Sequence, residues 1–535
     1  MAFVPNHNQQ LTLMDSTFHL TEREKRFLEK SWAKTFAETV FPAIDESIFS
    51  ALYSPKASRP NTPVNVIVGA LILKEALGDT DEELVEALMF DIRYQYALHT
   101  TSFEEQPLSD RTLSRFRSRV LAYETEHGVD LIHECVVKMA KEIAQFMKIS
   151  PNMQRMDSMM VAANIKNLSL LELFYTCVAN LAKRMDQRKI VLPEEQHHYI
   201  EKDDLNRCVY HKREMDVTER TVAVMHDAEK LIAICDQTGE LDDTSEYQLL
   251  IRLMKERTIF DDNGTRRLRR KEEVENPSEV LLNPSDPEAT FRYKAGKKYL
   301  GYVGNLVESV GKNGSMVTDY AYEPNTYADH QFMEDYLKQQ RMFQEGAFLV
   351  ADGAYSSEKN SKAASSRNLK LVTTNFTGPK PDEIYADFKF SADGHFLLEC
   401  ANGCIPESCR YDSGNECSIA YFQTEECSSC PYQERCQPRF LKTRVRKSVS
   451  WKAVGRAKQL QFMKTEEFSQ YARFRNGVEA IPSLLRRKYH VDKIPAHGKN
   501  RTRLHFGFKI AALNFQKLLD HHNSLRHCAP KSKTA

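Results

Sequence analysis

The sequence Gly346-Ala-Phe-Leu-Val-Ala-Asp352-Gly-Ala-Tyr355 decides the fold. Its apolar run has no alternation, as expected of a strand covered on both faces, and it ends on one carboxylate followed by a glycine. Charge at the carboxyl end of such a strand is typical of a ligand, metal or substrate site. Residues 356–366 then predict a helix and residues 369–374 a second strand. The stretch therefore predicts an α/β unit that delivers Asp352 to an active site.

Length and composition set the class of protein. The chain has 535 residues, which predicts several structural units, and 41% hydrophobic with 28% charged residues is typical of a soluble globular protein. The formal net charge is zero. The first residues lack the pattern of a signal peptide, and the longest apolar patch, residues 64–73, is too short to span a bilayer. These features predict a cytoplasmic protein with no membrane segment.

Residues 20–150 have a helical pattern with clear start and stop signals. Thr62-Pro63 begins one predicted helix and Gly78 ends it. Thr80 and Glu83 form a capping box for a second helix that extends to about Leu98.

A third predicted helix begins after Ser109 and has two distinct faces. Its apolar face carries Leu113, Phe116 and Val120. Its basic face carries Arg111, Arg115 and Arg119. This pattern is compatible with a helix-turn-helix-like module that contacts DNA, and equally with an ordinary solvated basic face.

From Pro151 onward the pattern changes to short strands. Residues 167–285 interrupt the strands with a mostly helical insertion, and Gly311-Lys-Asn-Gly314 predicts a hairpin turn between two later strands. We expect a helical N-terminal DNA-binding domain over residues 1–150 and a catalytic domain over residues 151–535. The second domain contains the helical insertion and a cysteine-rich insertion over residues 395–440.

Three acids stand out because each lies in partly apolar, non-acidic sequence: Asp157, Asp352 and Glu479. On composition alone, any one of them is more often a solvated side chain than a ligand.

The motifs around these acids resemble those of the acidic-triad (DDE) transposases of bacterial insertion sequences. The motifs are Met156-Asp-Ser-Met-Met-Val-Ala-Ala-Asn164, Val350-Ala-Asp-Gly-Ala-Tyr355 and Arg475-Asn-Gly-Val-Glu479, in that order. The resemblance covers nearly the whole chain, including a helical region at 45–125 and a closing helix at 504–519. It implies a ribonuclease-H-like core, a mixed sheet flanked by helices, that cuts DNA at element ends and joins them to a target.

The physical chemistry of the three acids agrees with that implication. Two hard cations about 3.5–4 Å apart can activate a nucleophile and stabilise a leaving oxygen in phosphodiester displacement. Carboxylates are suitable ligands for Mg²⁺ or Mn²⁺. We therefore predict two ions, with Asp157 and Asp352 as the principal ligands and Glu479 completing the second metal site.

The resemblance also implies that Arg475 and Arg486 contact phosphate, for which the guanidinium fork is suited. On a continuous helix both would share a side with Glu479. The sequence departs from the family pattern at two places. Ala472 stands where related transposases often have tyrosine, and Pro482 lies within the expected helix, where it predicts a kink beside Glu479.

Seven of the twelve cysteines lie between Cys400 and Cys436. In a cytosolic protein this spacing favours a structural zinc site over disulfides, with free or redox-active thiols as the alternative. The candidate ligands are Cys404, Cys409, Cys427, Cys430 and Cys436. Similar transposases carry a cysteine-rich insertion between the second Asp and the Glu, which matches this position.

A basic segment with interleaved aromatic residues follows the cysteines. Its central cations are Arg444, Arg446 and Lys447. Such a segment suits a DNA backbone track, with an exposed linker as the alternative.

The sequence thus predicts a transposase that binds the terminal inverted repeats of its element and catalyses metal-dependent end cleavage and strand transfer. A homodimer on double-stranded DNA is expected by analogy. Two alternatives stay open: a DNA-binding derivative that Pro482 has inactivated, and a stand-alone nuclease of the same fold.

Overall fold

The computed structural model describes residues 1–6, 15–54, 56, 59–103, 106–211, 216–294, 296–376 and 378–528. The chain divides into two compact units. The first unit comprises Met1–Pro151, Ser158–Ala328 and Ala480–Ala535, and the second comprises Asn152–Asp157 and Asp329–Glu479. Strand β1 thus contributes its first half to the second unit and its second half to the first. The predicted division at residue 150 into two sequential domains stays a prediction.

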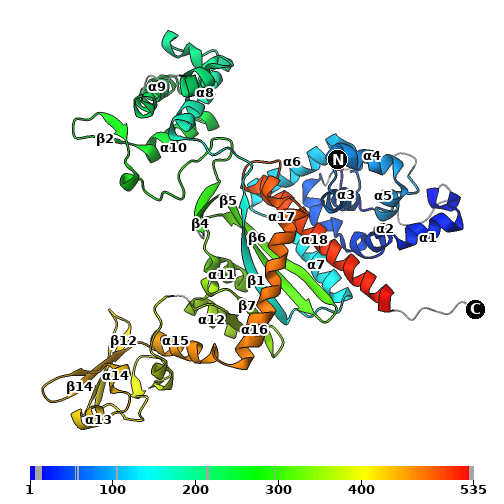
Figure 1. Ribbon diagram of the computed structural model, residues 1–535. Coiled ribbons are helices and arrows are strands. Elements are labelled where there is room, and N and C mark those ends of the chain that lie inside the picture. The colour runs from blue at the N-terminus through cyan, green and yellow to red at the C-terminus, as the bar shows by residue number, and fades with distance from the viewer. Residues whose placement is uncertain are drawn as a thin grey trace, which may run out of the picture. The chain divides into compact units, whose positions relative to one another are not determined.

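A mixed sheet forms the centre of the fold (Figure 1). Its strand order is β4-β5-β1-β7-β8, with β6 also paired to β5. The strands are β1 (Met153–Ala162), β4 (Thr290–Lys294), β5 (Lys297–Gly311), β6 (Gly314–Pro324), β7 (Ala347–Ala351) and β8 (Leu369–Thr373). The β1–β7 and β7–β8 pairs are parallel, whereas β4–β5 and β5–β6 are antiparallel.

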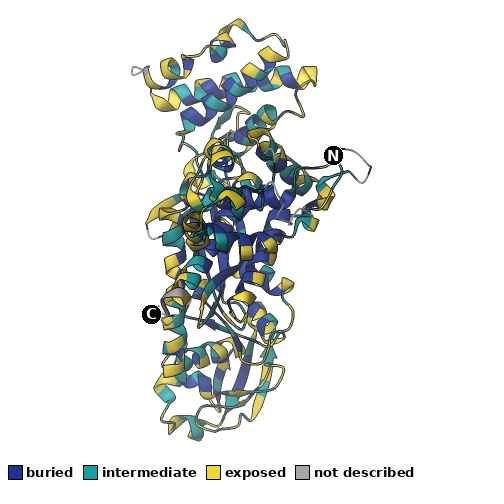
Figure 2. Ribbon diagram, turned by 90° about the vertical axis from the view of Figure 1, so that its right-hand side faces the viewer, coloured by how far each residue is buried: buried dark blue, intermediate teal, exposed yellow. Residues whose placement is uncertain are grey.

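Helices cover the sheet within each unit. In the first unit α7 (Leu131–Phe146) and α18 (Lys499–Cys528) pack on β6, and in the second α16 (Glu466–Asn476) packs on β7. Buried residues concentrate along these layers (Figure 2). This mixed sheet flanked by helices confirms the predicted α/β class.

The local signals in the sheet act as predicted. In β7 four of the five residues are buried, which explains its continuous apolar run. Gly311 pairs with Gly314 across a two-residue turn at Lys312 and Asn313, so the predicted hairpin between β5 and β6 is confirmed.

Helices dominate the N-terminal region. They are α1 (Glu22–Lys30), α2 (Trp32–Thr35), α3 (Val64–Leu77), α4 (Asp81–Phe90), α5 (Ile92–Ala97), α6 (Asp110–His127) and α7. Short helical turns lie between them: η1 (Ser16–His19), η2 (Phe36–Val40), η3 (Phe41–Ala43) and η4 (Glu46–Leu52).

These helices begin and end where the sequence signals predict, with one correction. Helix α3 ends at Gly78, whose φ of +86° favours glycine, and the capping box of Thr80 is formed. The predicted single helix from Thr80 to Leu98 is wrong. Asp91 adopts an extended conformation and its side chain accepts a hydrogen bond from the Arg93 amide, so it ends α4 and caps a separate α5.

The insertion after β1 forms a helical bundle around its own apolar core (Figure 1). Its elements are α8 (Leu170–Gln187), η5 (Glu194–Ile200), η6 (Asn206–His211), α9 (Val217–Thr238), α10 (Ser245–Arg257), β2 (Thr258–Phe260), β3 (Arg266–Leu268) and η7 (Lys271–Glu273). Helix α8 packs against α9, α10 and η5.

The second unit adds a smaller, separate sheet to β7 and β8. The order of this sheet is β11-β12-β14-β13. The remaining elements of the unit are α11 (Asp329–Gln339), η8 (Gly353–Tyr355), α12 (Glu358–Ser365), η9 (Glu383–Asp387), β9 (Lys389–Phe390), β10 (Leu397–Glu399), β11 (Ser408–Asp412), β12 (Cys417–Phe422), α13 (Thr424–Ser428), α14 (Gln433–Cys436), β13 (Arg439–Phe440), β14 (Val445–Val449), α15 (Trp451–Phe462), α16 and η10 (Gly477–Glu479).

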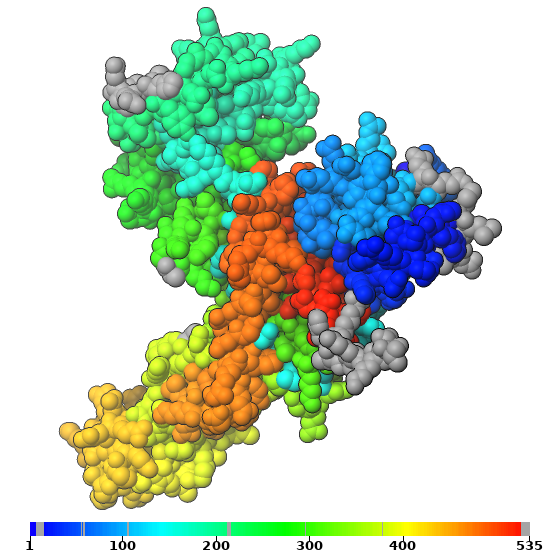
Figure 3. Space-filling model, turned by 45° about the vertical axis from the view of Figure 1, so that its right-hand side comes forward, coloured from blue at the N-terminus to red at the C-terminus, as the bar shows by residue number. Residues whose placement is uncertain are grey.

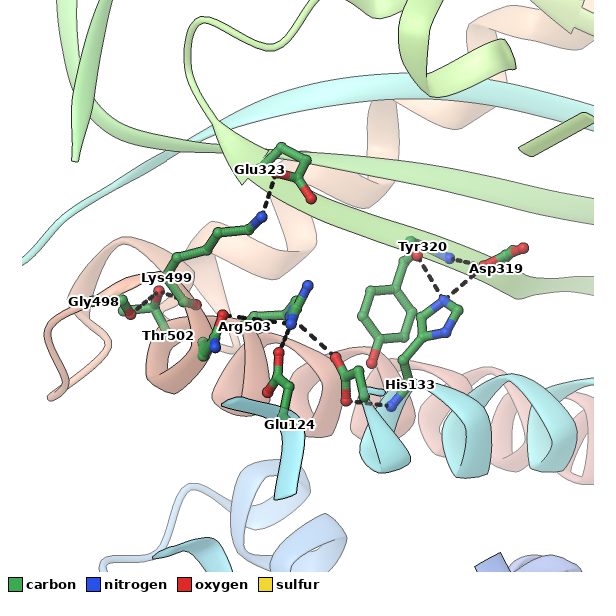
Figure 4. Close-up of polar contacts among 11 residues, drawn as sticks. Glu124, His133, Asp319, Tyr320, Glu323, Gly498, Lys499, Thr502 and Arg503 are labelled. Carbon is green, nitrogen blue, oxygen red and sulfur yellow. Dashed lines mark hydrogen bonds and ion pairs between the residues drawn. The ribbon is translucent and has the colours of Figure 1, made fainter. Parts of the chain in front are cut away.

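The chain returns to the first unit through α17 (Ala480–Arg487), η11 (Val491–Lys493) and the closing helix α18. Helix α18, red in Figure 3, packs against α2 and α3 of the blue N-terminal region and against α7. Figure 4 shows polar contacts at its start: Arg503 pairs with Glu124 and, at 3.1 Å, with Asp130, and Lys499 pairs with Glu323. None of the helices in the described ranges combines the length and apolar character that a membrane span requires.

A buried ion pair joins α18 to α3. Lys509 Nζ lies 2.6 Å from Glu75 Oε2, and His505 Nδ1 lies 3.7 Å from Glu75 Oε1. Burial alone would raise the pKa of Glu75, but hydrogen bonds and charge from His505 and Lys509 lower it to about 2. Because the folded pKa is depressed, this stabilisation is present above the ordinary carboxyl pKa and is lost as the pH falls towards 2.

We expect Lys509→Met to lower the free energy of unfolding by about 3 kcal/mol at pH 7, because it leaves the buried Glu75 carboxylate poorly compensated. The deficit should shrink as the pH falls towards 2, where Glu75 becomes neutral in both proteins. Urea titrations at several pH values measure this. Lys488→Met, at an exposed lysine that contacts Gln516, is the control. An equal loss at every pH would contradict the assignment.

Candidate active site

Two neighbouring parallel strands deliver the first two predicted acids to one place. Met153, Gln154 and Arg155 of β1 pair with Phe348, Leu349 and Val350 of β7. Continued for two residues, this register sets Asp157 level with Asp352. Adjacent strands lie about 4.8 Å apart, so the two aspartates are neighbours at the carboxyl end of β7. The Asp157 side chain is only 17% exposed.

Asp352 is fixed by two hydrogen bonds. Its Oδ1 accepts from the Gly353 amide at 2.6 Å and from Asn375 Nδ2 at 2.7 Å. Asn375 lies two residues beyond β8, the next parallel strand. The sequence reasoning missed it, although a polar side chain just after a neighbouring parallel strand was the available signal. Asn375 therefore orients the carboxylate that the β7 strand delivers.

Glu479 ends a short 3₁₀ turn rather than lying within a helix. The α-helical pattern of α16 stops at Asn476, and α17 begins at Ala480. Pro482 has no amide hydrogen to donate and its ring would clash with the carbonyl of Val478, which explains a break at this point. The α-helical pattern is therefore interrupted beside Glu479, at the place where the sequence predicts a kink. The continuous helix that would carry Glu479 and Arg486 on one side is not formed.

Arg475 links Asp157 to Glu479. Its Nη2 lies 3.4 Å from Asp157 Oδ1, and its Nη1 lies 3.4 Å from Glu479 Oε1. The Arg475 side chain is 11% exposed, whereas Glu479 is 63% exposed. The Nε of Arg475 is buried and has no hydrogen-bond partner among the residues that the structure describes. The three predicted acids thus gather in the second unit, with the Arg475 guanidinium between two of them.

Arg155 ties the end of α16 to β1, and the sequence reasoning missed it. Its Nη1 donates to the Phe474 carbonyl at 2.9 Å, and its guanidinium lies 5.6 Å from the centre of the Phe474 ring. Arg155 precedes Asp157 by two residues on a strand, so both face the same side of the sheet. That spacing was the signal that could have identified it. Arg155 is a positioning residue for the segment that carries Arg475.

The donor set suits a hard divalent cation. Asp157, Asp352 and Glu479 offer only carboxylate oxygens, which Mg²⁺ and Mn²⁺ prefer. Within the described ranges, oxygens of these three acids do not all lie within 4.8 Å of one another. Asp157 and Asp352 are held by strands, whereas Glu479 is exposed on a turn and paired with Arg475. The chemistry of the three acids therefore fits the ion, with Glu479 as the least constrained ligand.

Two family models match the sequence. A model described as a transposase DDE domain matches residues 400–519, which include Arg475 and Glu479. A model described as a transposase domain (DUF772) matches residues 24–119 of the N-terminal helical region. Together these matches support a DDE transposase of an insertion sequence. The resemblance inferred from the three acidic motifs is thereby confirmed.

Among solved structures, a cryo-EM structure of the piggyBac transposase synaptic complex with hairpin DNA aligns with this transposase. The alignment covers 93% of this chain and 75% of that chain, at 8% identity and a TM-score of 0.28. A likeness at this level carries no argument about the site. No curated protein matches the sequence.

A cavity of about 690 Å³ in the second unit reaches Asn375, the residue that orients Asp352. Its walls combine aromatic rings, cations and small polar side chains. They include Ser356, Asn375, Phe376, Trp451, Lys452 and Arg456. The Arg456 guanidinium lies 4.9 Å from the centre of the Phe376 ring. Stacking surfaces beside positive charge suit an unpaired nucleotide of DNA.

The predicted basic residues of the second unit differ in how they are held. Arg444 is exposed and lies 3.9 Å from the centre of the Tyr421 ring, and Arg446 is half-buried on β14. Lys447 is buried, donates to Tyr385 Oη at 2.8 Å and also contacts the Cys436 carbonyl. Because its ammonium group is bound inside the unit, we leave Lys447 out of the proposed DNA contact.

The predicted basic residues of the first unit also differ in their exposure and contacts. On α6, Arg111 and Arg115 are exposed, and Arg119 is half-buried with its guanidinium 5.4 Å from the centre of the Tyr53 ring. The apolar face of α6 is buried as predicted. Arg486 donates to the Met160 carbonyl at 2.7 Å and pairs with Asp492 at 3.1 Å. A phosphate contact by Arg486 would compete with this pairing.

Five thiols gather beside the small sheet of the second unit. Burial, followed by the nearby thiols of Cys436, Cys400, Cys430 and Cys404, raises the pKa of Cys427 to about 11. Cys409 lies on β11 with its Sγ 2.8 Å from Ser418 Oγ, and it packs against the same apolar cluster as four of these thiols. Cys400, which the prediction left out, lies with the group. In the described ranges no three of these sulfurs lie within 4.8 Å of one another, so zinc stays a prediction.

If zinc occupies this group, Cys427→Ser should lower the zinc content of the purified transposase by one equivalent per chain. Cys417→Ser should leave it unchanged, because the Cys417 thiol contacts Ser448 on β14. Elemental analysis after zinc-replete expression measures both. An unchanged zinc content in Cys427→Ser would contradict the prediction.

Proposed function

We propose that this transposase cleaves DNA at the ends of its own element and joins those ends to a target. One observation carries the proposal: Arg475 bridges Asp157 to Glu479. The β1–β7 register, continued for two residues, also sets Asp352 level with Asp157. Two of the three acids, far apart in the sequence, therefore share one buried arginine. Three carboxylates together are costly to hold unless a cation compensates them, which supports divalent metal ions at this place.

When bound, two divalent ions supply activation of the attacking hydroxyl and stabilisation of the leaving oxygen. Asp157, Asp352 and Glu479 are the residues that would hold them. The chain's own contribution is orientation. Asn375 fixes one carboxylate, and Arg155 fixes the backbone of the segment that carries Arg475 and Glu479. A misplacement of about 1 Å in such a site can lower the rate roughly a hundredfold.

Arg475 has the features of a phosphate contact. Its guanidinium is largely buried, its two terminal nitrogens face carboxylates at the long distance of 3.4 Å, and its Nε has no partner among the described residues. A phosphate oxygen that reaches the terminal nitrogens would accept a charge-assisted hydrogen bond from them. The scissile phosphate would then lie beside the acids that hold the metal ions.

Further contacts to DNA follow from charge and shape. We infer that the exposed Arg111 and Arg115 of α6 contact the backbone of the double-stranded inverted repeat, since cations bind phosphates without reading sequence. In the second unit, the exposed Arg444 would contact a DNA phosphate. The aromatic and cationic cavity beside Asn375 would hold an unpaired nucleotide near the cleaved phosphate. Two ends must be handled together, so a homodimer on DNA is part of the proposal.

A cleavage and joining assay tests the proposal. The substrate is a labelled duplex carrying one end of the element that encodes the chain, with a supercoiled plasmid as target. In Mg²⁺ or Mn²⁺ we expect a cut at the element end and covalent joining to the plasmid, and no reaction in excess chelator. Cutting without joining would indicate a stand-alone nuclease. Binding without cutting, with folding verified, would indicate the inactivated derivative.

A further inference from the structure

A second group of metal-binding side chains lies in the helical insertion, outside the acidic site. His198 lies on η5, Asp204 in the short helical segment directly before η6, and Cys208 on η6. One ligand atom from each lies within 4.8 Å of the other two. Among the described residues this is the one set of three His, Cys, Asp or Glu side chains that meets this condition.

The three side chains converge on one point. His198 Nδ1 lies 2.6 Å from Asp204 Oδ2 and 4.0 Å from Cys208 Sγ, which in turn lies 3.4 Å from Asp204 Oδ1. Zinc bonds of about 2.0–2.3 Å in tetrahedral geometry separate ligand atoms by roughly 3.3–3.7 Å. Small side-chain movements would bring all three distances into that range. The imidazole and the carboxylate would move apart, and the thiol would move towards the imidazole.

The arrangement differs from that of a nucleophile activated by a base. In such a relay the acid and the nucleophile contact different nitrogens of the imidazole ring. Here both Asp204 and Cys208 face the same atom, Nδ1 of His198. A shared cation satisfies this convergence, whereas a proton relay does not.

A second layer of contacts fixes the ligands. Asp204 is buried, and its Oδ2 accepts a hydrogen bond from the buried Tyr175 at 2.6 Å. Burial would raise the pKa of Asp204, but hydrogen bonds from Tyr175 and His198 outweigh it and lower the pKa. The His198 ring lies 4.1 Å from the Tyr199 ring, centre to centre. Outer contacts of this kind orient ligands in protein metal sites.

We propose that His198, Asp204 and Cys208 bind one transition-metal ion of the zinc type. A nitrogen, an oxygen and a sulfur donor favour Zn²⁺ over Mg²⁺, and three protein ligands leave one position for water. On binding, Cys208 loses its thiol proton to solvent, and His198 keeps a single proton on Nε2 while Nδ1 coordinates the ion. The ion cross-links η5 to η6 at the edge of the insertion core.

One cationic side chain, that of Arg207, lies close to the three proposed ligands. Arg207 Nε lies 3.9 Å from Asp204 Oδ1, but the Arg207 guanidinium also pairs with Glu201. Both of these side chains are more than half exposed. Arg207 can therefore turn towards Glu201 and solvent when the ion binds.

Cobalt binding to the full-length protein tests the proposal. After removal of metal, Co²⁺ is titrated and its thiolate charge-transfer absorption and stoichiometry are measured. We expect Cys208→Ser and His198→Gln each to bind one equivalent per chain fewer than the native protein. His226→Gln, at an exposed histidine of α9 paired with Glu229, should bind the native number. Equal stoichiometry in all four proteins would overturn the proposal.

A second experiment uses the native protein, so it tests the proposal even if a variant does not fold. Cys208 is alkylated with iodoacetamide in metal-stripped and zinc-loaded native protein, and its labelling rate is read by peptide mass spectrometry. We expect zinc to slow the labelling of Cys208 at least tenfold, because a coordinated thiolate is withheld from the reagent. Equal rates in the two states would show that the three side chains form only a hydrogen-bonded group.

Discussion

Asp352→Asn is expected to lower metal-dependent DNA cleavage by a factor of at least about a thousand while leaving the fold intact. The amide keeps a carbonyl oxygen that can accept from Gly353 and Asn375, so the turn after β7 should persist. It removes the negative charge that a divalent ion requires of its ligand. Single-turnover cleavage of a labelled element-end duplex measures the rate.

Asp335→Asn is the matched control for this substitution. Asp335 lies on α11 of the same unit, where its half-exposed side chain pairs with Lys338. The control should cleave at the native rate. Retention of more than a tenth of native activity by Asp352→Asn would contradict the assignment of Asp352 as a metal ligand.

Gly477→Ala is expected to lower cleavage by about a hundredfold and to destabilise the second unit by about 1–3 kcal/mol. A Cβ atom at Gly477 would lie 2.0 Å from Arg155 Nη1 and 2.8 Å from its Cζ. The guanidinium would have to leave the Phe474 carbonyl, and the backbone that carries Arg475 and Glu479 would lose its tie to β1. Urea unfolding and the cleavage assay measure the two effects.

A double-mutant cycle separates the clash from other effects. If Gly477→Ala acts by displacing Arg155, the pair Arg155→Ala with Gly477→Ala should be no less active than Gly477→Ala alone. Gly414→Ala, where the new Cβ meets only Asp412 Oδ1 at 3.5 Å, should behave as the native protein. Additive losses in the double variant would show that Gly477 acts independently of Arg155.

The sequence predicted those parts of the site that local patterns determine. The uninterrupted apolar run before Asp352 predicted a strand buried on both faces, and the ordered acidic motifs named the other two acids as candidates. The break beside Glu479 followed from Pro482, because a missing amide donor acts at a fixed offset along a helix. Each of these inferences needed only neighbouring residues or a family pattern.

Contacts between distant segments account for what the sequence could not predict. Asn375 and Arg155 acquire their roles from the pairing of β7 with β8 and from the packing of α16, and nothing near them in the sequence specifies either contact. Lys447 lies in a run of cations typical of a solvated segment, yet it is bound to Tyr385 in the interior of the unit. Burial of one member of a charged run depends on the tertiary structure.

The central claim is that Asp157, Asp352 and Glu479 together hold divalent ions for DNA cleavage. The most direct measurement is the cleavage rate of Asp352→Cys in Mg²⁺ and in Mn²⁺, beside the native protein in both. Thiolate is a poor ligand for Mg²⁺ and a better one for the softer Mn²⁺. We predict that the variant is inactive in Mg²⁺ and regains activity in Mn²⁺. Native-level cleavage by Asp352→Cys in Mg²⁺ would contradict the account.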